Sequence, residues 1–527
     1  MWTSGWRDEI WESLTRQQWD LIIIGGGITG AGILREAARI GLRCVLFEAG
    51  DFASGTSSRS SKLIHGGLRY LKNFQVKLTS ESVHEREHLL KEGRGLVAPL
   101  SFIMANFEGD HTPPWLFGLG LSFYDLLALK WNHAFYQADA LRQLCPPLTS
   151  PNMVSGFRYF DAQADDARLV LRVLQEAVSD GAVALNYTRV ENLLRDASGM
   201  VCGVVLTDAD GSNERSVEVQ AGSVISATGA WADGLRSRLG GDQRLRILRG
   251  SHLFFPWEKL PLSRAVTFWH PIDQRPVFIY PWEGVTLVGT TDVDHDADPS
   301  TNIRISRQEA NYLLEAVNYA FPDLSLALQD VRSSLSGIRA VVDTGKADPS
   351  RESREFIIWK ENGLLTVSGG KLTTFRIMAH KALKALGPDI KRESQLDREG
   401  RVLDGLPEET TLCNIPPDLR LRLLGRYGRA ACQMDSAAVE GELTQIQDSP
   451  SLWAELRWAA RAEGVLHLDD LLLRRVRLGI QLENGGIPIL DHIRSIVQPE
   501  LGWTDEKWMG EVQTYKNLWN SFYSPPV

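Results

Sequence analysis

The strongest constraint on the fold of this chain comes from residues 20–48, DLIIIGGGITGAGILREAARIGLRCVLFE. The apolar, β-branched run at 21–24 predicts a strand that is buried on both faces of a parallel sheet. The pattern G-x-G-x-x-G follows at Gly25, Gly27 and Gly30. In a dinucleotide-binding fold the first glycine allows a tight turn and the second lets the backbone approach a pyrophosphate. The third lets the helix pack closely on the strand.

A helix and a second strand complete this unit. The helical segment at 33–40 ends before Gly41, and a second apolar strand at 44–47 ends on Glu48. An acid at the end of that strand can accept hydrogen bonds from ribose hydroxyls, and its charge disfavours a 2′-phosphate. An ordinary βαβ unit would give no reason for Glu48. The segment therefore predicts a site for the ADP part of a dinucleotide, and it does not choose between NAD and FAD.

Length and composition indicate a multidomain protein with no general affinity for nucleic acid. The chain has 527 residues, which is too long for one simple core and predicts two or three domains. Its net charge of −9 gives no basis for nucleic-acid binding. The five cysteines show neither a C-x-x-C pair nor a metal-ligand spacing, so we expect packing thiols, a reducing compartment and no metal. Because the N-terminal residues are polar, we expect no signal peptide.

Two apolar stretches raise the question of contact with a membrane. Residues 115–129, WLFGLGLSFYDLLAL, include Asp125 and are too short to span a bilayer. We expect a buried helix there, and a helix that dips into a membrane surface is the alternative. In residues 2–19, Trp2, Trp6 and further apolar residues recur near helical spacing. We expect this stripe to dock on its own protein, with membrane contact again the alternative.

A polar loop follows the predicted ribose-binding strand. Residues 50–70, GDFASGTSSRSSKLIHGGLRY, are rich in Ser, Thr and Gly and carry Arg59, Lys62, His65 and Arg69. Such a loop offers hydroxyls and backbone N–H groups. In a dinucleotide-binding protein we expect it to run along the cofactor.

Seven motifs resemble those of the FAD-dependent glycerol-3-phosphate dehydrogenases, which belong to the D-amino-acid-oxidase-like flavoproteins. They are GTSSRSSKLIHGGLRYL (55–71), DDARLVL (165–171), ATGAWAD (227–233), GSH (250–252), VGTTDV (288–293), SGIR (336–339) and SGGKLTTFR (368–376). They follow the family's order up to about residue 376, and a region that resembles the family's C-terminal helical domain comes after them. The resemblance implies FAD as the cofactor. It implies sn-glycerol 3-phosphate as the substrate and dihydroxyacetone phosphate as the product.

The resemblance also implies the fold class, α/β + α. A Rossmann-like FAD-binding domain of the GR2 or D-amino-acid-oxidase type is interleaved with an antiparallel-sheet substrate domain, and an all-helical C-terminal domain follows. We assign the FAD-binding domain to residues 18–80, 150–235 and 335–385, the substrate domain to 81–149 and 236–334, and the helical domain to 400–527. Within them we expect separate strands at 215–219 and 223–227, a capped helix at 306–320 and a hairpin around Asn362-Gly363.

The implied reaction sets three tasks for the site. A hydride passes from C2 of the substrate to flavin N5, a proton leaves the 2-hydroxyl, and a dianionic phosphate must be held. Arginine offers planar, bidentate donors for phosphate. By resemblance, the predicted substrate-binding residues are Arg339, Arg354 and Lys371, with Thr290 or Thr291, and with Arg69 and Tyr70 as weaker candidates. The family usually has proline where this chain has Ala340, so we expect a looser turn after Arg339.

The reduced flavin carries negative charge near N1 and the C2 carbonyl, which favours N–H donors from a helix N-terminus. Residues 369–374, GGKLTT, come just before a predicted helix at 375–384 and are expected to supply these donors. Lys371 serves the flavin, the phosphate or both. The predicted cofactor-binding residues are Gly25, Gly27, Gly30, Glu48, Ser57, Ser58, Lys62, Leu63, Thr228, Gly229, Gly370, Lys371, Leu372 and Thr373.

Two histidines are candidates for the base that removes the hydroxyl proton. His65 lies in the polar loop and His252 lies in the GSH motif, and histidine titrates in the pH range that proton removal needs. Each has a structural alternative as a hydrogen-bonded histidine, and an arginine-assisted alkoxide or water is a further option. The predicted catalytic set is His252, His65, Arg339 and Lys371.

The electron acceptor is less constrained than the substrate. By resemblance the electrons pass to a membrane quinone, which implies peripheral attachment at the cytoplasmic face of the cell membrane. The alternative is an oxidase that uses O2 and forms H2O2. An amine or amino-acid oxidase would need a carboxylate clamp and an apolar pocket, which the arginine–lysine cluster does not favour. A flavin-bound protein without turnover would not explain the polar loop. The sequence does not fix the oligomeric state, and a homodimer is left open.

Overall fold

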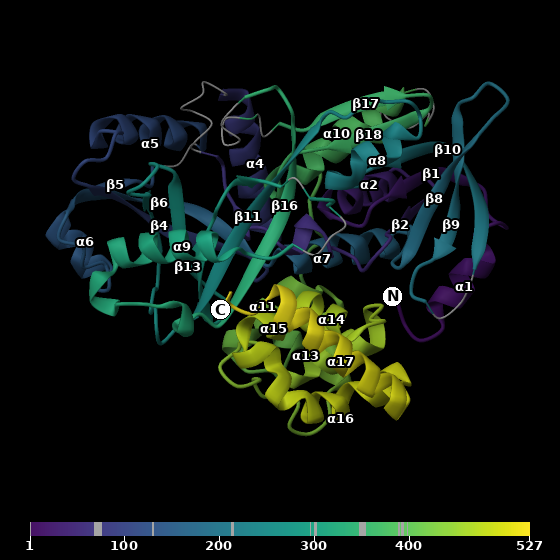
Figure 1. Cartoon of the computed structure of the whole chain (residues 1–527). Helices are drawn as coiled ribbons and strands as arrows, with labels where there is room; N and C mark the ends of the chain where they lie inside the picture. Colours follow the sequence, from purple (N-terminus) through teal and green to yellow (C-terminus); the bar gives the residue numbers. More distant parts are fainter. Residues whose placement is uncertain are drawn as a thin grey trace.

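The computed structural model contains two large β-sheets and a separate group of C-terminal helices (Figure 1). The structure describes residues 2–67, 76–128, 131–211, 215–295, 297–299, 303–346, 352, 355–387, 390, 395–397 and 399–526. In Figure 1 the C-terminal helices, in yellow, lie below the layer that the two sheets form.

The first sheet carries the predicted βαβ unit at its centre. Its strand order is β17-β18-β10-β1-β2-β7, with β8 and β9 extending β10 as an antiparallel meander. The bounds are β1 (Trp19–Ile24), β2 (Cys44–Phe47), β7 (Val183–Leu185), β8 (Thr188–Arg195), β9 (Val201–Asp208), β10 (Ser216–Ser226), β17 (Ile357–Glu361) and β18 (Leu364–Ser368). The helices α2 (Ile28–Arg39), α7 (Asp166–Ser179) and α10 (Phe375–Leu386) pack side by side along this sheet.

The expected strands at 215–219 and 223–227 are a single strand, β10. Its first half pairs with β9 and its second half pairs with β1 and β18, so the chain needs no turn between them. The expected capping box at Ser306 and Glu309 is confirmed at the start of α9 (Arg307–Ala320). The hairpin around Asn362-Gly363 is confirmed as β17 and β18.

The second sheet is built around two long antiparallel strands, β11 and β16, which cross the middle of the molecule (Figure 1). Its strands are β3 (Leu63–Ile64), β4 (Val97–Phe107), β5 (Ala134–Gln137), β6 (Met153–Ala164), β11 (Leu245–Pro256), β12 (Ala265–Trp269), β13 (Pro276–Trp282), β14 (Val285–Gly289), β15 (Val293–Asp294) and β16 (Ser333–Val342). Three of these strands, β3, β6 and β16, come from segments that we assigned to the FAD-binding domain. The two sheets therefore share chain segments, and the polar loop leads from β2 in the first sheet to β3 in the second.

The C-terminal region is helical, as expected. Its helices are α11 (Pro417–Tyr427), α12 (Ala430–Ala437), α13 (Trp453–Ala462), α14 (Leu468–Asp470), α15 (Leu478–Gln481), α16 (Leu490–Leu501) and α17 (Asp505–Phe522), with one π-helical turn, η10 (Leu471–Arg475). The remaining α-helices are α1 (Trp6–Ser13), α4 (Val76–Glu92), α5 (Pro114–Ala128), α6 (Ala138–Leu144) and α8 (Ala232–Ser237).

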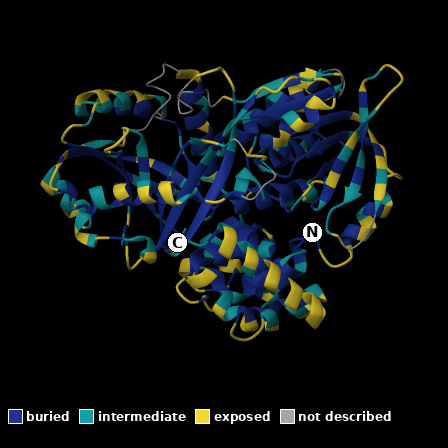
Figure 2. Ribbon diagram, viewed as in Figure 1, coloured by how far each residue is buried: buried dark blue, intermediate teal, exposed yellow. Residues whose placement is uncertain are grey.

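The two apolar stretches behave differently. Trp2, Trp6 and their neighbours in α1 are buried against the first sheet, so this stripe docks on its own protein. The expectation of a buried helix at 115–129 is wrong, because α5 lies at the surface with Trp115 66% and Leu119 60% exposed (Figure 2). Apolar residues run around the whole circumference of α5, and only one side of a surface helix can pack on the protein.

Candidate active site

The candidate site lies at the carboxyl ends of three parallel strands of the first sheet. β1 ends at Ile24, which pairs with Ser226 of β10, and Ser226 pairs in turn with Thr366 of β18. The turns after these strands carry the glycine motifs predicted from the sequence. They meet at one edge of the sheet, which is where open parallel sheets bind their ligands.

The turn after β1 has no space for side chains at two positions. Gly25 has φ 110°, and a Cβ there would lie 2.6 Å from the carbonyl oxygen of Ala227. A Cβ at Gly30 would overlap the carbonyl oxygen of Gly25. α2 begins at Ile28, behind Gly27, with no side-chain cap and no acid in its first turn. The N-terminus of this helix therefore suits an anionic group such as a pyrophosphate.

Glu48 fixes the same turn from the neighbouring strand. Its carboxylate accepts the backbone N–H of Gly26 at 2.6 Å and that of Gly50 at 2.8 Å. Burial raises the pKa of this carboxyl group, and the two N–H groups oppose the shift. Each carboxylate oxygen has a second lone pair, so Glu48 can hold the turn and still accept from ribose hydroxyls. The glycines, the helix N-terminus and the acid thus fit the ADP part of FAD.

Ser57 and Lys62 of the polar loop form hydrogen bonds and an ion pair with other groups of the protein. Ser57 accepts the N–H of the first residue of α2 at 2.9 Å. The buried amine of Lys62 pairs with Asp166 at 2.9 Å and donates to the carbonyl of Ser58 at 3.2 Å. Burial, and then the charge of a neighbouring arginine, lowers the pKa of Lys62 to about 8. Leu63 begins β3, so the loop passes directly into the second sheet.

Arginines from the C-terminal helices hold the other side of this loop. The buried guanidinium of Arg477 donates to the carbonyl of Ser58 at 2.9 Å and lies 3.3 Å from Asp166. Arg475 donates to both oxygens of Asp51, at 2.6 and 2.8 Å. The contact of these arginines with the loop was not predicted from the sequence. The available signal was the run of arginines among leucines in residues 468–479.

Two further turns reach the same edge. Thr228 and Gly229 follow β10, and the hydroxyl of Ser368, at the end of β18, donates to the carbonyl of Gly229 at 3.1 Å. Gly370 has φ 82°, and a Cβ there would overlap the sulfur of Met378. The turns after β1, β10 and β18 therefore pack tightly at this edge, and the positions of Gly25, Gly30 and Gly370 leave no space for a side chain.

Residues 371–374, which come just before α10, contact segments that are far away in the sequence. A 3₁₀ turn, Leu372–Thr374, comes just before the helix. The hydroxyl of Thr373 donates to the backbone carbonyl of His65 at 3.4 Å, and the amine of Lys371 donates to the hydroxyl of Ser82 in α4 at 3.1 Å. This turn thus places Lys371 beside the segment of the polar loop that contains His65.

Strands β11 and β16 position Arg339, one of the residues predicted to bind the substrate phosphate. The guanidinium of Arg339 lies 3.4 Å from Asp292 and 3.5 Å from the hydroxyl of Thr290, and its side chain is 26% exposed. A Cβ at Gly250 would overlap Nη2 of Arg339 and would lie 2.8 Å from the hydroxyl oxygen of Thr290. The glycine of the GSH motif therefore makes room for this guanidinium beside a hydroxyl donor.

The other predicted substrate residues are placed differently. Thr291 is buried, and its hydroxyl donates to Glu309 at 2.7 Å, so it supports the protein framework. Arg354, Arg69 and Tyr70 lie outside the residues that the structure describes.

His252 is buried in β11 of the second sheet. Its ring packs on Gly289 of β14, and its Nε2 lies 2.9 Å from the hydroxyl oxygen of Ser61 in the polar loop. Burial, followed by the charges of Lys62 and Arg339, lowers the pKa of His252 to about 3. The imidazole is therefore neutral at pH 7 and is a weak base until a negative charge enters the site.

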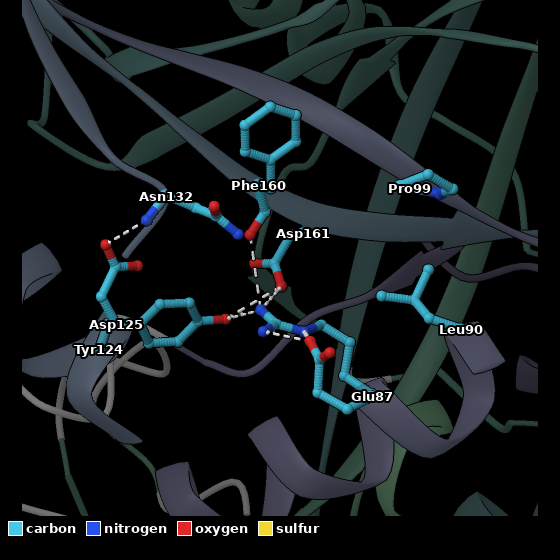
Figure 3. Close-up of a pocket in the computed structure, with 9 residues that line it drawn as sticks. Glu87, Leu90, Pro99, Tyr124, Asp125, Asn132, Phe160 and Asp161 are labelled. Carbon is cyan, nitrogen blue, oxygen red and sulfur yellow. Dashed lines mark hydrogen bonds and ion pairs between the residues drawn. The ribbon is translucent and has the colours of Figure 1, made fainter. Parts of the chain in front are cut away.

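A cavity of about 180 Å³ lies behind the polar loop, between α4, α5 and the second sheet (Figure 3). In it, Arg86 of α4 donates to Asp161 at 2.7 Å and to the hydroxyl of Tyr124 at 2.7 Å. Both acceptors receive the backbone N–H of Gly66, at 3.2 and 3.0 Å. This buried group of side chains holds the backbone next to His65, and sequence analysis did not identify it.

Comparisons with known proteins define the family. A model of FAD-dependent oxidoreductases matches residues 20–376, and a model of the C-terminal domain of alpha-glycerophosphate oxidase matches residues 369–508. The aerobic glycerol-3-phosphate dehydrogenase of Staphylococcus haemolyticus is 32% identical over 495 residues, which cover 89% of this chain and 88% of the relative. The chain belongs to the FAD-dependent glycerol-3-phosphate dehydrogenase family. The Staphylococcus aureus dehydrogenase gives the same identity over 501 residues, which again cover 89% of this chain and 88% of the relative.

Solved structures share the fold. The glycerol-3-phosphate dehydrogenase of Bacillus halodurans, solved in complex with FAD, matches with a TM-score of 0.79 and 28% identity. The match covers 99% of this chain and 98% of that chain. The L-alpha-glycerophosphate oxidase of Mycoplasma pneumoniae matches with a TM-score of 0.55 and 18% identity, covering 70% of this chain and 95% of that chain, and it shows the shared fold. FAD is thus the cofactor of the family, and the glycine turns described above fit it.

Proposed function

We propose that this protein oxidises sn-glycerol 3-phosphate to dihydroxyacetone phosphate and passes the electrons to a membrane quinone. The observation that carries the first half is the placement of Arg339 beside Thr290, in the space left by Gly250, next to the edge where the glycine turns converge. A planar, charged donor with a neighbouring hydroxyl suits a phosphate. FAD, when bound, supplies the chemistry by accepting the hydride from C2 of the substrate.

The side chains of this protein would bind the substrate and move its proton. Arg339 and Thr290 hold the phosphate, and Lys371, at the approach to α10, stabilises negative charge near the flavin. His252 is the candidate base. A bound dianion offsets the positive charges that help to lower the pKa of His252, so substrate binding itself makes this imidazole a stronger base. His65 is the alternative base, beside the same turn.

Product analysis with an artificial dye acceptor tests the reaction. Glycerol 3-phosphate should give stoichiometric dihydroxyacetone phosphate, whereas glycerol, which lacks the phosphate, and glycine, which offers an amine, should give no dye reduction. Turnover of glycine without turnover of glycerol 3-phosphate would contradict the proposal and would favour an amino-acid oxidase.

The exposed face of α5 supports the second half of the proposal. Among the described residues no helix is long and apolar enough to cross a membrane. α5 nevertheless exposes large apolar side chains in succession, namely Trp115 (66%), Leu116 (47%), Leu119 (60%), Phe123 (40%) and Leu126 (61%). An apolar surface of this kind favours insertion into the head-group region of a bilayer. We infer that α5 attaches the protein to the cytoplasmic face of the cell membrane, where it can reach quinone.

Sedimentation with liposomes tests this attachment. The double substitution Leu119→Glu and Leu126→Glu should abolish co-sedimentation, because two charges would have to enter the bilayer interface. Trp257→Glu, at an aromatic residue that is 51% exposed and lies outside α5, is the matched control and should bind as the unchanged protein does. Equal binding of all three proteins would exclude α5. Hydrogen peroxide formed in proportion to substrate, with no reduction of quinone, would identify an oxidase instead.

A further inference from the structure

A single buried carboxylate connects three of the segments that carry candidate site residues. It belongs to Glu309, in the first turn of α9, and its side chain is 6% exposed. α9 packs against β11 and β14 of the second sheet (Figure 1). The two carboxylate oxygens accept hydrogen bonds from different parts of the protein, so each oxygen has its own role.

One oxygen of Glu309 completes the cap of its own helix. Oε2 accepts the backbone N–H of Ser306 at 3.0 Å and the hydroxyl of the same residue at 2.9 Å. The hydroxyl of Ser306 accepts the backbone N–H of Glu309 in return, which completes the capping box. A capping box needs only this oxygen. Helix capping therefore does not explain the contacts of the other oxygen.

The other oxygen holds the motifs GSH and VGTTDV together. Oε1 accepts the hydroxyl of Ser251 at 2.9 Å and the hydroxyl of Thr291 at 2.7 Å. The hydroxyl oxygen of Thr291 in turn accepts the backbone N–H of Ser251 at 2.9 Å. Ser251 directly precedes His252, and Thr291 directly follows Thr290. The carboxylate thus fixes the backbone next to the candidate base and next to a candidate phosphate donor.

The motif SGIR is connected to the same carboxylate through a second hydroxyl. Ser251 lies opposite Ser336 in the register of β11 and β16, and their hydroxyl oxygens are 2.8 Å apart. Ser336 comes three residues before Arg339 in β16. The two serine hydroxyls therefore link the carboxylate to the strand that carries Arg339.

This group of side chains is buried and charged. Ser251, Thr291 and Ser336 are each at most 3% exposed. Burial alone would raise the pKa of Glu309, but its hydrogen bonds and its arginine partner outweigh burial and lower the pKa. Arg249 donates to the two oxygens at 3.3 and 2.9 Å and offsets their charge. Hydrogen bonds to an ionised acceptor are stronger than neutral ones, and in a buried site little water weakens them.

We propose that Glu309 is a positioning residue, which holds the candidate base His252 at a fixed distance from the phosphate-binding side chains. The proposal rests on the function proposed above, because it assigns these groups to the proton and the phosphate of one substrate. The reaction depends on that distance, since a misplacement of about 1 Å can lower a rate about 100-fold. A carboxylate that only capped α9 would affect stability and not the reaction.

Substitutions on the two sides of the carboxylate test the proposal. Thr291→Val keeps the shape of the side chain and removes the hydroxyl that donates to Oε1, and Thr291→Ser restores a hydroxyl. Glu309→Gln removes the charge from both sides. Ser306→Ala is the matched control, because it removes a donor to Oε2 and alters only the helix cap. Each variant is purified as holoenzyme, and rates are expressed per bound flavin at a temperature well below unfolding.

Anaerobic stopped-flow bleaching of the flavin by glycerol 3-phosphate is the readout. Glu309→Gln and Thr291→Val should lower the limiting rate by roughly 10- to 100-fold and should raise the apparent dissociation constant of the substrate. Thr291→Ser should recover most of this loss. Ser306→Ala should lower the melting temperature, because the helix loses its cap, while the limiting rate and the dissociation constant stay unchanged.

The outcomes separate the positioning role from the proposed function. Bleaching kinetics in Glu309→Gln and Thr291→Val equal to those of the unchanged protein would overturn the positioning role. An equal loss of rate in Ser306→Ala would also overturn it, because the carboxylate would then act through the stability of α9. If Glu309→Gln gives no folded holoenzyme, the two Thr291 variants decide in the same way. If the unchanged protein does not bleach with glycerol 3-phosphate, the proposed function itself fails.

Discussion

Replacement of Arg339 by lysine should weaken substrate binding strongly. The guanidinium lies 3.4 Å from Asp292 and 3.5 Å from the hydroxyl of Thr290, in the space left by Gly250. Lysine keeps the charge but loses the planar pair of donors. A hydrogen bond to a charged group contributes about 1.5–3 kcal/mol, so loss of one such bond corresponds to a roughly 10- to 100-fold higher KM.

Stopped-flow bleaching of the flavin under anaerobic conditions measures this effect directly. The limiting rate should change much less than the apparent substrate affinity, because phosphate binding acts equally on ground state and transition state. Gly250→Ala is a second probe, since the added methyl group would displace Nη2 of Arg339 while keeping its charge. Arg246→Lys is the control, because Arg246 lies in β11, which pairs with the strand of Arg339, and forms an ion pair with Asp294. A KM for Arg339→Lys within twofold of the unchanged protein would refute the reasoning, as would an equal loss in Arg246→Lys.

Three further substitutions follow from the site. Arg477→Met should lower the free energy of unfolding by about 1–3 kcal/mol and weaken FAD binding in fluorescence titrations, because it removes the donor to the carbonyl of Ser58 and one of the two cations beside the buried carboxylate of Asp166. Arg461→Met, at a side chain that is 40% exposed, should cost less than about 1 kcal/mol, and a similar loss in both variants would remove Arg477 from the cofactor site. Gly30→Ala should abolish FAD retention on a desalting column, because its Cβ would overlap the carbonyl oxygen of Gly25; full retention would contradict the tight turn. His252 has a folded pKa of about 3, below its ordinary 6.5, so its contribution to stability is complete above pH 6.5 and is lost as the pH falls toward 3. His252→Gln should therefore lose less unfolding free energy than the unchanged protein between pH 6.5 and 4 in denaturant titrations, and parallel losses would refute the shifted pKa.

The parts of the fold that sequence reasoning predicted depend on local rules. A glycine turn between an apolar strand and a helix has few alternatives, and Gly25 and Gly30 show why, since neither position has space for a Cβ. The capping box at Ser306 follows from contacts within four residues. Motif resemblance extended the predictions to the whole chain: Gly250 lies against the guanidinium of Arg339, and the turn at Gly370 follows β18.

The parts that were missed depend on contacts between distant segments. Arg477 reaches Ser58 across 419 residues, and nothing near either residue in the sequence indicates that contact. Lys62 was predicted to bind the cofactor. In the structure its amine donates to Asp166, which is 104 residues away in the sequence. The exposed face of α5 could not be told from a buried helix, because a segment that is apolar on every side has no periodicity to mark its outer face.

The central claim is that glycerol 3-phosphate reduces a flavin held at the glycine turns. Its most direct test is an anaerobic titration of the purified holoenzyme, followed by the flavin absorbance. The account predicts complete bleaching after one equivalent of glycerol 3-phosphate per flavin and no bleaching with glycerol. A flavin that stays oxidised with glycerol 3-phosphate, while dithionite still bleaches it, would contradict the account.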